Sequence, residues 1–301
     1  DPGKKLVTAS ELNAVELHKN DFVTTLKASS QSGVYKPGDP IVLTFTSEKD
    51  AYLTILDFTP TGNIIVLYPN DLMTNKDNFV KANEPVVIPV SGDGYIMKAG
   101  DRVGVDVVKA IATTDKDKQI YDKEGGNVVL APPFSALKDT VSATRDILIV
   151  MEESDPEPEP GPPVPSLWSV ASCAVMTDPG DGSPNGFAVT EDGGAKMWTN
   201  GYRFLVGEQV FVHFLSEKAG KVVSLVNAGA SSNENNMLPE GANEFKFEAG
   251  QLLILPRPDD KWKFVASVKP GEDAINAKLA FDDGTEAELS LKVTVEEDDG
   301  E

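Results

Sequence analysis

The sequence predicts a mainly β protein with two antiparallel β-sandwich domains, immunoglobulin-like or jelly-roll-like, and one or two short helices. Three observations predict this class. Short apolar segments rich in β-branched residues alternate with polar ones, turn residues separate them, and a motif over 33–70 returns from 201 onward. Gly38 and Gly207 are 169 positions apart, as are Phe45 and Phe214. Two related β-domains are therefore expected.

The first domain is expected to span 1–154. Thr8 and Glu11 have the spacing of a helix capping box, which predicts a helix up to residue 18, and a second helix is expected over 135–145. From residue 22 the hydrophobic period changes to two, as in a strand. The expected strands are 22–27, 41–46, 52–58, 64–68, 86–89, 94–97, 103–112 and a closing strand at 147–151.

Residues 155–165 form an acidic, proline-rich segment that predicts a linker between the domains. Its alternating prolines remove amide donors and fix φ, and its carboxylates repel one another, so an extended polyproline II conformation is favoured. Two independently folded bodies are expected on either side of it.

The second domain, possibly a divergent repeat of the first, is expected over 166–301. Alternation over 289–295 is the clearest strand signal in the chain. The run 262–268 is expected to take the place that 103–112 has in the first domain. The other expected strands are 168–171, 187–189, 196–198, 210–214, 222–226 and 252–255, with a final hairpin turning at 282–284.

The charge balance excludes several classes of partner. The 27 Lys and Arg against 48 Asp and Glu give a net charge of −21, with −6 over 1–154, −3 over the linker and −12 over 166–301. Such a surface repels phosphate backbones and anionic headgroups, so neither nucleic acid nor a membrane surface is an expected partner. No apolar run is long enough to cross a bilayer, which predicts no membrane insertion within this chain.

Residues 33–112 resemble a bacterial family known only as domain-of-unknown-function family 4384, and a degenerate second copy is expected at about 201–268. The features that carry the resemblance are the turn 36–39, the strand 52–57, Gly62-Asn63, Leu67-Tyr68-Pro69-Asn70, Ile88-Pro89 and 109–112. The resemblance implies an accessory module of envelope or secreted proteins without catalytic residues. The second copy keeps the opening glycine and the Ser-Glu-Lys segment but has no Pro-Asn pair.

No catalytic, cofactor or metal residues are predicted. The chain has two histidines, His18 at the end of the first expected helix and His213 inside a strand, and both are expected to be structural or solvent-facing. Cys173 is the single cysteine, so no intrachain disulfide can form, and it has no basic neighbour in sequence to activate it. A small buried side chain is expected there.

Two groups of residues are weighed as ligand sites. The loop Asp178 to Asn185 carries carboxylate and amide oxygens as calcium prefers, but it lacks the spacing of a twelve-position calcium loop and has the composition of an ordinary turn. The aromatic side chains could bind glycans or peptides, but their spread over strands and turns favours core roles. These aromatics are Tyr35, Tyr68, Tyr95, Trp168, Trp198 and Trp262.

The function expected is a non-catalytic cell-envelope, periplasmic or secreted bacterial module that presents a strand edge or loop surface to a protein or envelope polymer. The chain begins at Asp1 without methionine, so a leader or anchor is presumed removed. One alternative is an accessory or regulatory region of a larger protein whose catalytic domain lies upstream. A further alternative is a calcium-dependent adhesin. The sequence leaves the ligand, the oligomeric state and the domain orientation open.

Overall fold

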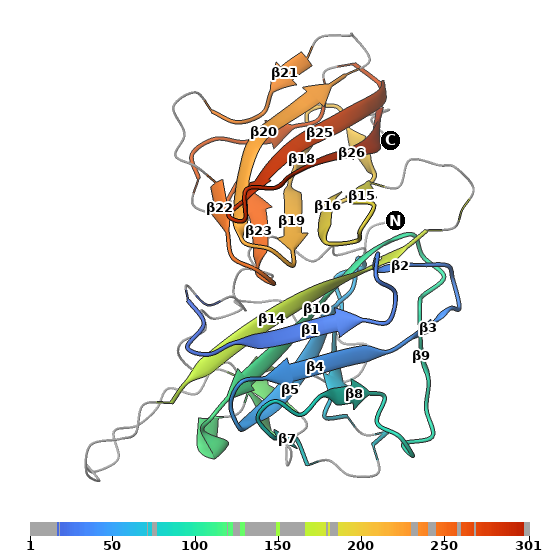
Figure 1. Cartoon of the computed structure of the whole chain (residues 1–301). Coiled ribbons are helices and arrows are strands. Elements are labelled where there is room, and N and C mark those ends of the chain that lie inside the picture. The colour runs from blue at the N-terminus through green and yellow to red at the C-terminus, as the bar shows by residue number, and fades with distance from the viewer. Residues whose placement is uncertain are drawn as a thin grey trace. The chain divides into compact units, whose positions relative to one another are not determined.

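The strands of the computed structural model fall into two compact units (Figure 1). Unit 1 comprises 1–27, 42–96 and 107–172, and unit 2 comprises 28–41, 97–106 and 173–301. The structure describes residues 17, 19–70, 72–73, 77–118, 120–122, 127–129, 149–150, 166–178, 180, 186–229, 234–239, 245–257, 260–267 and 269–297.

The first set of sheets is named here the N-terminal sandwich. A three-stranded sheet has the order β1-β4-β8, and a larger sheet has the order β2-β14-β10-β5-β6, with β7 also paired to β5. Strands β3 and β9 form a separate ribbon. The bounds are β1 (Thr24–Ala28), β2 (Val34–Tyr35), β3 (Pro40–Ile41), β4 (Leu43–Ser47), β5 (Ala51–Phe58), β6 (Ile64–Tyr68), β7 (Phe79–Val80), β8 (Val86–Ile88), β9 (Met97–Lys98), β10 (Gly104–Thr113) and β14 (Trp168–Thr177).

The second set is named the C-terminal sandwich and lies wholly in unit 2. Its sheets have the orders β15-β16-β19-β23 and β17-β26-β25-β20-β21, with β22 also paired to β20 and with β18 paired to β24. The bounds are β15 (Phe187–Val189), β16 (Ala195–Thr199), β17 (Arg203–Leu205), β18 (Gln209–Val210), β19 (Val212–Ser216), β20 (Gly220–Ala228), β21 (Glu234–Asn236), β22 (Phe245–Phe247), β23 (Leu252–Leu255), β24 (Phe264–Val265), β25 (Gly271–Phe281) and β26 (Glu286–Glu296).

The two sandwiches share one topology. The order β2-β14-β10-β5-β6 with β7 on β5 is repeated as β17-β26-β25-β20-β21 with β22 on β20. Local hydrogen bonds repeat with it: Lys36 N donates to Asp39 Oδ2 at 2.9 Å, and Leu205 N donates to Glu208 Oε2 at 2.8 Å. The mainly β sandwich architecture expected from the sequence is therefore confirmed, and the repeat reaches the level of individual turns.

The closing strand of the N-terminal sandwich is β14, although its residues 168–171 are expected from the sequence to belong to the second domain. β14 lies beside β10 in the larger sheet, and Thr114 N donates to Leu167 O at 3.1 Å where the two strands begin to pair. Its topological counterpart is β26, the last strand of the C-terminal sandwich. The expected boundary at 166 therefore differs from the observed pairing, because a proline-rich composition does not reveal which strands pair across it.

Side chains of Asn20 and Asp21 complete the open edge of β14. Asn20 Nδ2 donates to Val170 O at 3.0 Å, and Val170 N donates to Asn20 Oδ1 at 2.9 Å. Trp168 N donates to Asp21 Oδ2 at 2.8 Å. One side-chain amide thus satisfies both backbone groups of Val170, as a neighbouring strand residue would.

Other expected elements are placed as follows. The helices at 8–18 and 135–145 and the linker 155–165 lie outside the described residues, apart from Leu17. The expected closing strand at 147–151 contains β13 (Ile149–Val150), which pairs with β12 (Asn127–Val129) beside β11 (Tyr121–Asp122) in a small sheet instead. The run 262–268 was assigned wrongly to the place of 103–112: it contains β24, the counterpart of β9, and β25 takes the place of β10.

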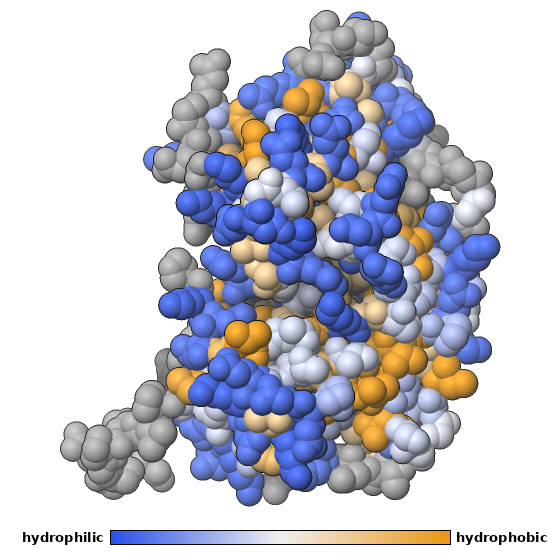
Figure 2. Space-filling view, viewed as in Figure 1, coloured by the Kyte–Doolittle hydropathy of each residue, from blue (hydrophilic) through white to orange (hydrophobic). Residues whose placement is uncertain are grey.

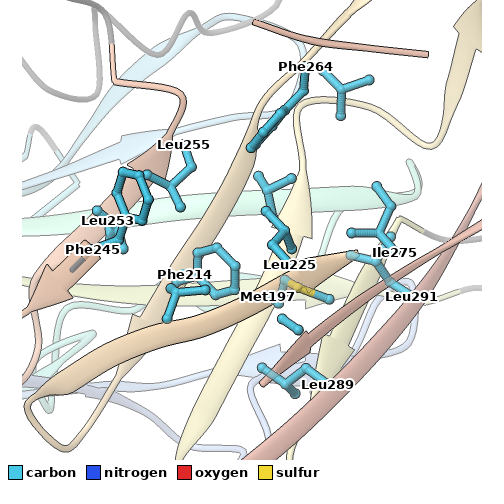
Figure 3. Close-up of a cluster of buried hydrophobic side chains, with 14 of the residues drawn as sticks. Met197, Phe214, Leu225, Phe245, Leu253, Leu255, Phe264, Ile275, Leu289 and Leu291 are labelled. Carbon is cyan, nitrogen blue, oxygen red and sulfur yellow. The ribbon is translucent and has the colours of Figure 1, made fainter. Parts of the chain in front are cut away.

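The core of the C-terminal sandwich is formed by inward side chains of both sheets (Figure 3). Met197 and Phe214 come from the smaller sheet, and Leu225, Ile275 and Leu291 from the larger one. Alternation along the strands explains which side chains enter the core, since every second residue of β26 from Leu289 to Val295 is buried.

Gly193 is required by a close backbone contact within unit 2. Its φ is +72°, and a Cβ atom there would overlap the carbonyl oxygen of Gln31, whose Nε2 donates to Asp192 O at 2.9 Å. We expect Gly193→Ala to lower the free energy of unfolding by about 1–3 kcal/mol, measured by denaturant titration. Gly250→Ala is the control, because Gly250 has the same φ of +72° and a Cβ atom there would meet no atom within 4 Å. Equal losses in the two variants would show that the contact with Gln31 adds nothing.

Candidate interaction surface

Two of the three residues considered for catalysis are buried. His213 is 3% exposed and stacks on Trp198 with ring centroids 5.3 Å apart, on the face of β19 opposite to the core residues Val212 and Phe214. Cys173 is a buried free thiol in β14. His18 lies outside the described residues. These positions give His213 and Cys173 packing roles.

The loop considered for calcium is described only at its ends. Asp178 Oδ1 accepts a hydrogen bond from Gly180 N at 2.9 Å, as in an ordinary turn, and 181–185 lie outside the described residues. Within the described ranges no group of three His, Cys, Asp or Glu side chains is placed to hold a metal ion.

Most of the aromatic side chains considered for ligand binding are buried. Trp168, Trp198, Tyr35 and Tyr68 are each at most 5% exposed. Trp262 is half-buried against Phe245 and Phe264. A row of exposed rings, as a glycan-binding face would present, is not formed by these residues.

Exposed apolar side chains are concentrated in unit 1. Of nine large hydrophobic residues that are exposed among the described residues, six lie in this unit. They are Val23, Ile65, Leu72, Phe79, Val87 and Ile96. Figure 2 shows one face of this surface, on which apolar side chains gather where Figure 1 places β8. Three of the six lie between the start of β6 and the end of β7.

Strands β6 and β7 form one interrupted edge strand, named the β6–β7 edge (Ile64–Tyr68, Asn78 and Phe79–Val80). Both pair antiparallel with β5, so they run in the same direction along it. Between them Leu53 N donates to Asn78 O at 2.9 Å, and Asn78 Nδ2 donates to Leu53 O at 3.0 Å. The edge thus follows β5 from Phe58 to Ala51.

The backbone of this edge has donors and acceptors directed away from β5. Thr59 N, just beyond the end of β5, donates to Asn63 O, and Asp57 of β5 is paired with Ile65. The backbone groups of Asn63 and Ile65 are therefore directed toward the β5 side. In an antiparallel pair these bonds alternate, so the N–H groups of Ile64 and Val66 point to the open side. Among the described strands, β6 has no partner other than β5.

Polar contacts close the break between β6 and β7. Tyr68 OH donates to Asp77 O at 3.1 Å, and Asn70 Nδ2 donates to Tyr95 OH at 3.1 Å. Burial, followed by the charges of Asp77 and Asp93, raises the pKa of Tyr68 to about 12. Burial also raises the pKa of Tyr95, against the opposing hydrogen bond from Asn70. Both phenols are therefore neutral at physiological pH.

The corresponding edge of the C-terminal sandwich has a different character. Strand β21 has the sequence Glu-Asn-Asn, and in β22 the exposed residue is Lys246. Polar and charged residues are the usual protection of an edge strand against pairing with another chain. The sequence Ile-Ile-Val-Leu-Tyr of β6 has no such protection.

The two edges of the smaller N-terminal sheet carry a charge or flanking prolines, although Val87 of β8 is also exposed. Strand β1 carries the exposed Lys27, and β8 lies between Pro85 and Pro89, which have no amide donor. A strand at 64–68 is expected from the sequence, but no local sequence pattern shows that this strand lies at a sheet edge. The sequence signal that could indicate this difference is the contrast between the continuous apolar sequence of β6 and the polar sequence of β21.

No helix among the described residues is long and apolar enough to cross a membrane. No curated protein matches the chain. Three solved structures are similar at low identity: a tetra-tandem repeat from the extending region of a large adhesion protein (11% identity, TM-score 0.22, 91% of this chain and 49% of that chain), and alpha-2-macroglobulins of Salmonella (12%, 0.24, 93% and 17%) and E. coli (11%, 0.23, 92% and 17%). The chain thus spans about half or less of each of these chains.

The family comparison covers the part of the chain that contains the β6–β7 edge. The match begins at the first residue of β2 and extends just beyond β10, so it leaves β1 and β14 outside. Residues 34–116 match the family described as Domain of unknown function (DUF4384), which confirms the resemblance expected for 33–112.

Proposed function

We propose that this chain is a non-catalytic bacterial module of the cell envelope or secreted space, and that its N-terminal sandwich binds a protein by strand addition along the β6–β7 edge. The observation that carries the proposal is the uncharged, largely apolar β6, which lies at a sheet edge and exposes 44% of Ile65. The placement in the envelope rests on the kind of protein in which the resembling family occurs.

The spacing of the outward backbone N–H groups on this edge favours a polypeptide ligand over an envelope polysaccharide. The outward N–H groups of Ile64 and Val66 are two residues apart, and an added strand offers donors and acceptors at the same period. Main-chain bonds of this kind supply affinity, and the exposed side chains of Ile65 and Phe79 supply contacts for alternate side chains of the ligand.

The proposal is tested by selecting a displayed library of random linear peptides on the purified chain. Ile65→Lys places a charge on the edge strand, and we expect it to weaken the selected peptides at least 10-fold in fluorescence anisotropy, because edge lysines oppose strand pairing. Val265→Lys is the matched control, since Val265 is 53% exposed in the C-terminal sandwich. It is expected to change the affinity less than 2-fold.

Hydrogen exchange locates the binding. Bound peptide is expected to slow exchange at the amides of Ile64 and Val66, which face the open side of β6. Selection of no peptide above background, or equal loss of binding in the two lysine variants, would contradict the proposed function.

A further inference from the structure

We infer that the C-terminal sandwich has a second binding surface, which receives an extended acidic segment of another protein. This surface, named the 257–263 surface, consists of Arg257, Lys261, Trp262 and Lys263 in the connection between β23 and β24. The inference does not rest on the β6–β7 edge, because all four residues lie in unit 2. Three cations are thus gathered on a part of the chain, 166–301, in which 11 Lys and Arg stand against 23 Asp and Glu.

The cations of this surface differ from other cations of the C-terminal sandwich in lacking carboxylate partners. Within the described ranges no carboxylate oxygen lies within 4 Å of a side-chain nitrogen of Arg257, Lys261 or Lys263. All three side chains are exposed. Because the domain is rich in carboxylates and leaves these cations without one, the surface is complementary to carboxylates supplied by a partner. Four other cations of this sandwich form salt bridges at 2.7–2.9 Å, and they are Arg203, Lys218, Lys278 and Lys292.

Aromatic packing fixes the position of Arg257 and Trp262. Arg257 Cζ lies 5.8 Å from the centre of the Phe245 ring, and the Trp262 ring meets the same ring edge-on, with centroids 5.8 Å apart. Trp262 also packs on Phe264 at 4.8 Å, and both phenylalanines belong to the core shown in Figure 3. Arg257 N donates to Asp260 Oδ2 at 2.8 Å, which fixes the backbone. A planar guanidinium packed on an aromatic ring keeps the N–H groups at its rim available for a carboxylate.

The two lysines point to the same side of the chain. Exposure alternates along this segment: Lys261 and Lys263 are exposed, Trp262 between them is half-buried, and Phe264 is buried. In an extended backbone, residues two positions apart are separated by roughly 7 Å. An extended ligand with an acidic side chain at every second residue has the same spacing, so two of its carboxylates can meet the two lysines.

A short acidic peptide fits this surface better than a larger anion. Charges more than about 8 Å away are largely screened at physiological ionic strength, so a short segment interacts mainly with the local cations. A nucleic acid or a membrane would instead approach the acidic remainder of the protein closely. A polysaccharide would stack on exposed aromatic faces, whereas Phe245 and Phe264 are buried and Trp262 is half-buried.

The probe is a fluorescein-labelled peptide of Glu-Ala repeats, and its binding to the full chain is measured by fluorescence anisotropy at low ionic strength. We expect it to bind about 10-fold more tightly than the same peptide with glutamine in place of glutamate. It should bind about 3-fold more tightly than a Glu-Glu-Ala-Ala peptide of the same length and charge, which has a different carboxylate spacing. The affinity should fall in high salt, because exposed charges are screened.

Charge variants locate the binding. Lys261→Gln combined with Lys263→Gln is expected to weaken the Glu-Ala peptide about 10-fold, because both lysines lose their charge. Lys278→Gln combined with Lys292→Gln is the matched control, since it removes the same charge from exposed salt bridges of the same sandwich. Such bridges contribute little to stability, and the expected change in affinity is below about 2-fold. Lys263→Arg keeps the charge and should bind the peptide as the wild type does.

The outcomes that would overturn the inference are distinct from those for the proposed function. Equal losses in the two double variants would show that the peptide responds only to net charge. Equal binding of the glutamate and glutamine peptides would show that no carboxylate is recognised. Loss of the Glu-Ala peptide in Ile65→Lys would place its binding on the β6–β7 edge. Binding of polygalacturonate in place of the peptide would show that the ligand is a polysaccharide.

Discussion

Replacing Val170 by aspartate is expected to unfold the N-terminal sandwich and to leave the C-terminal sandwich folded. Val170 is 1% exposed in β14, and its N–H and C=O are held by Asn20. Removing a carboxylate from water at this buried position is costly, so we expect the free energy of unfolding of this sandwich to fall by about 4–5 kcal/mol.

Hydrogen exchange with mass spectrometry distinguishes the two sandwiches in the full chain. Peptides from β5 and β10 are expected to exchange rapidly in Val170→Asp, and peptides from β25 and β26 slowly. Val265→Asp is the control at an exposed position and should leave both patterns as in the wild type. Rapid exchange in β25 and β26, with β5 and β10 still protected, would show that β14 supports the second domain instead.

Replacing Phe214 by alanine is expected to lower the free energy of unfolding of the C-terminal sandwich by about 3–5 kcal/mol. Phe214 is 1% exposed and lies between the two sheets, where Met197 and Leu225 are also buried (Figure 3). Removing the ring loses its transfer free energy and leaves a cavity that the paired strands around it cannot fill by relaxing.

Calorimetry of the full chain measures this effect as a lower midpoint of one transition. Val223→Ala is the control, because Val223 is 49% exposed on β20 of the same sandwich, and its expected loss is below about 0.5 kcal/mol. A loss below about 1 kcal/mol for Phe214→Ala would show that the ring is not part of a close-packed core.

Several features of the fold could be predicted from the sequence because they depend on neighbouring residues. Alternation with period two predicted most strands, and 289–295 lies within β26, where every second residue is buried. The matching turns at Gly38 and Gly207 could be found because both glycines adopt positive φ, at +84° and +77°, in the same type of turn. The apolar sequence of β6 can also be recognised, but its position at a sheet edge cannot.

Two features were decided only by the tertiary structure. The sequence contains no signal that residues 168–177 pair with β10 across the long connection 114–167, because strand pairing depends on the complementarity of distant segments. The proline-rich run within that connection has the composition of a domain linker, which is a local property.

The candidate interaction surface likewise depends on how distant strands pair. The sequence by itself determined that 64–68 and 234–236 belong to two related halves and differ in polarity. Only the tertiary structure decided that both are edge strands, with β6 and β7 joined along β5 into one edge. Which backbone groups stay open to solvent follows from the assembly of the whole sheet, and an apolar strand becomes a binding surface only when that assembly leaves it without a second neighbour.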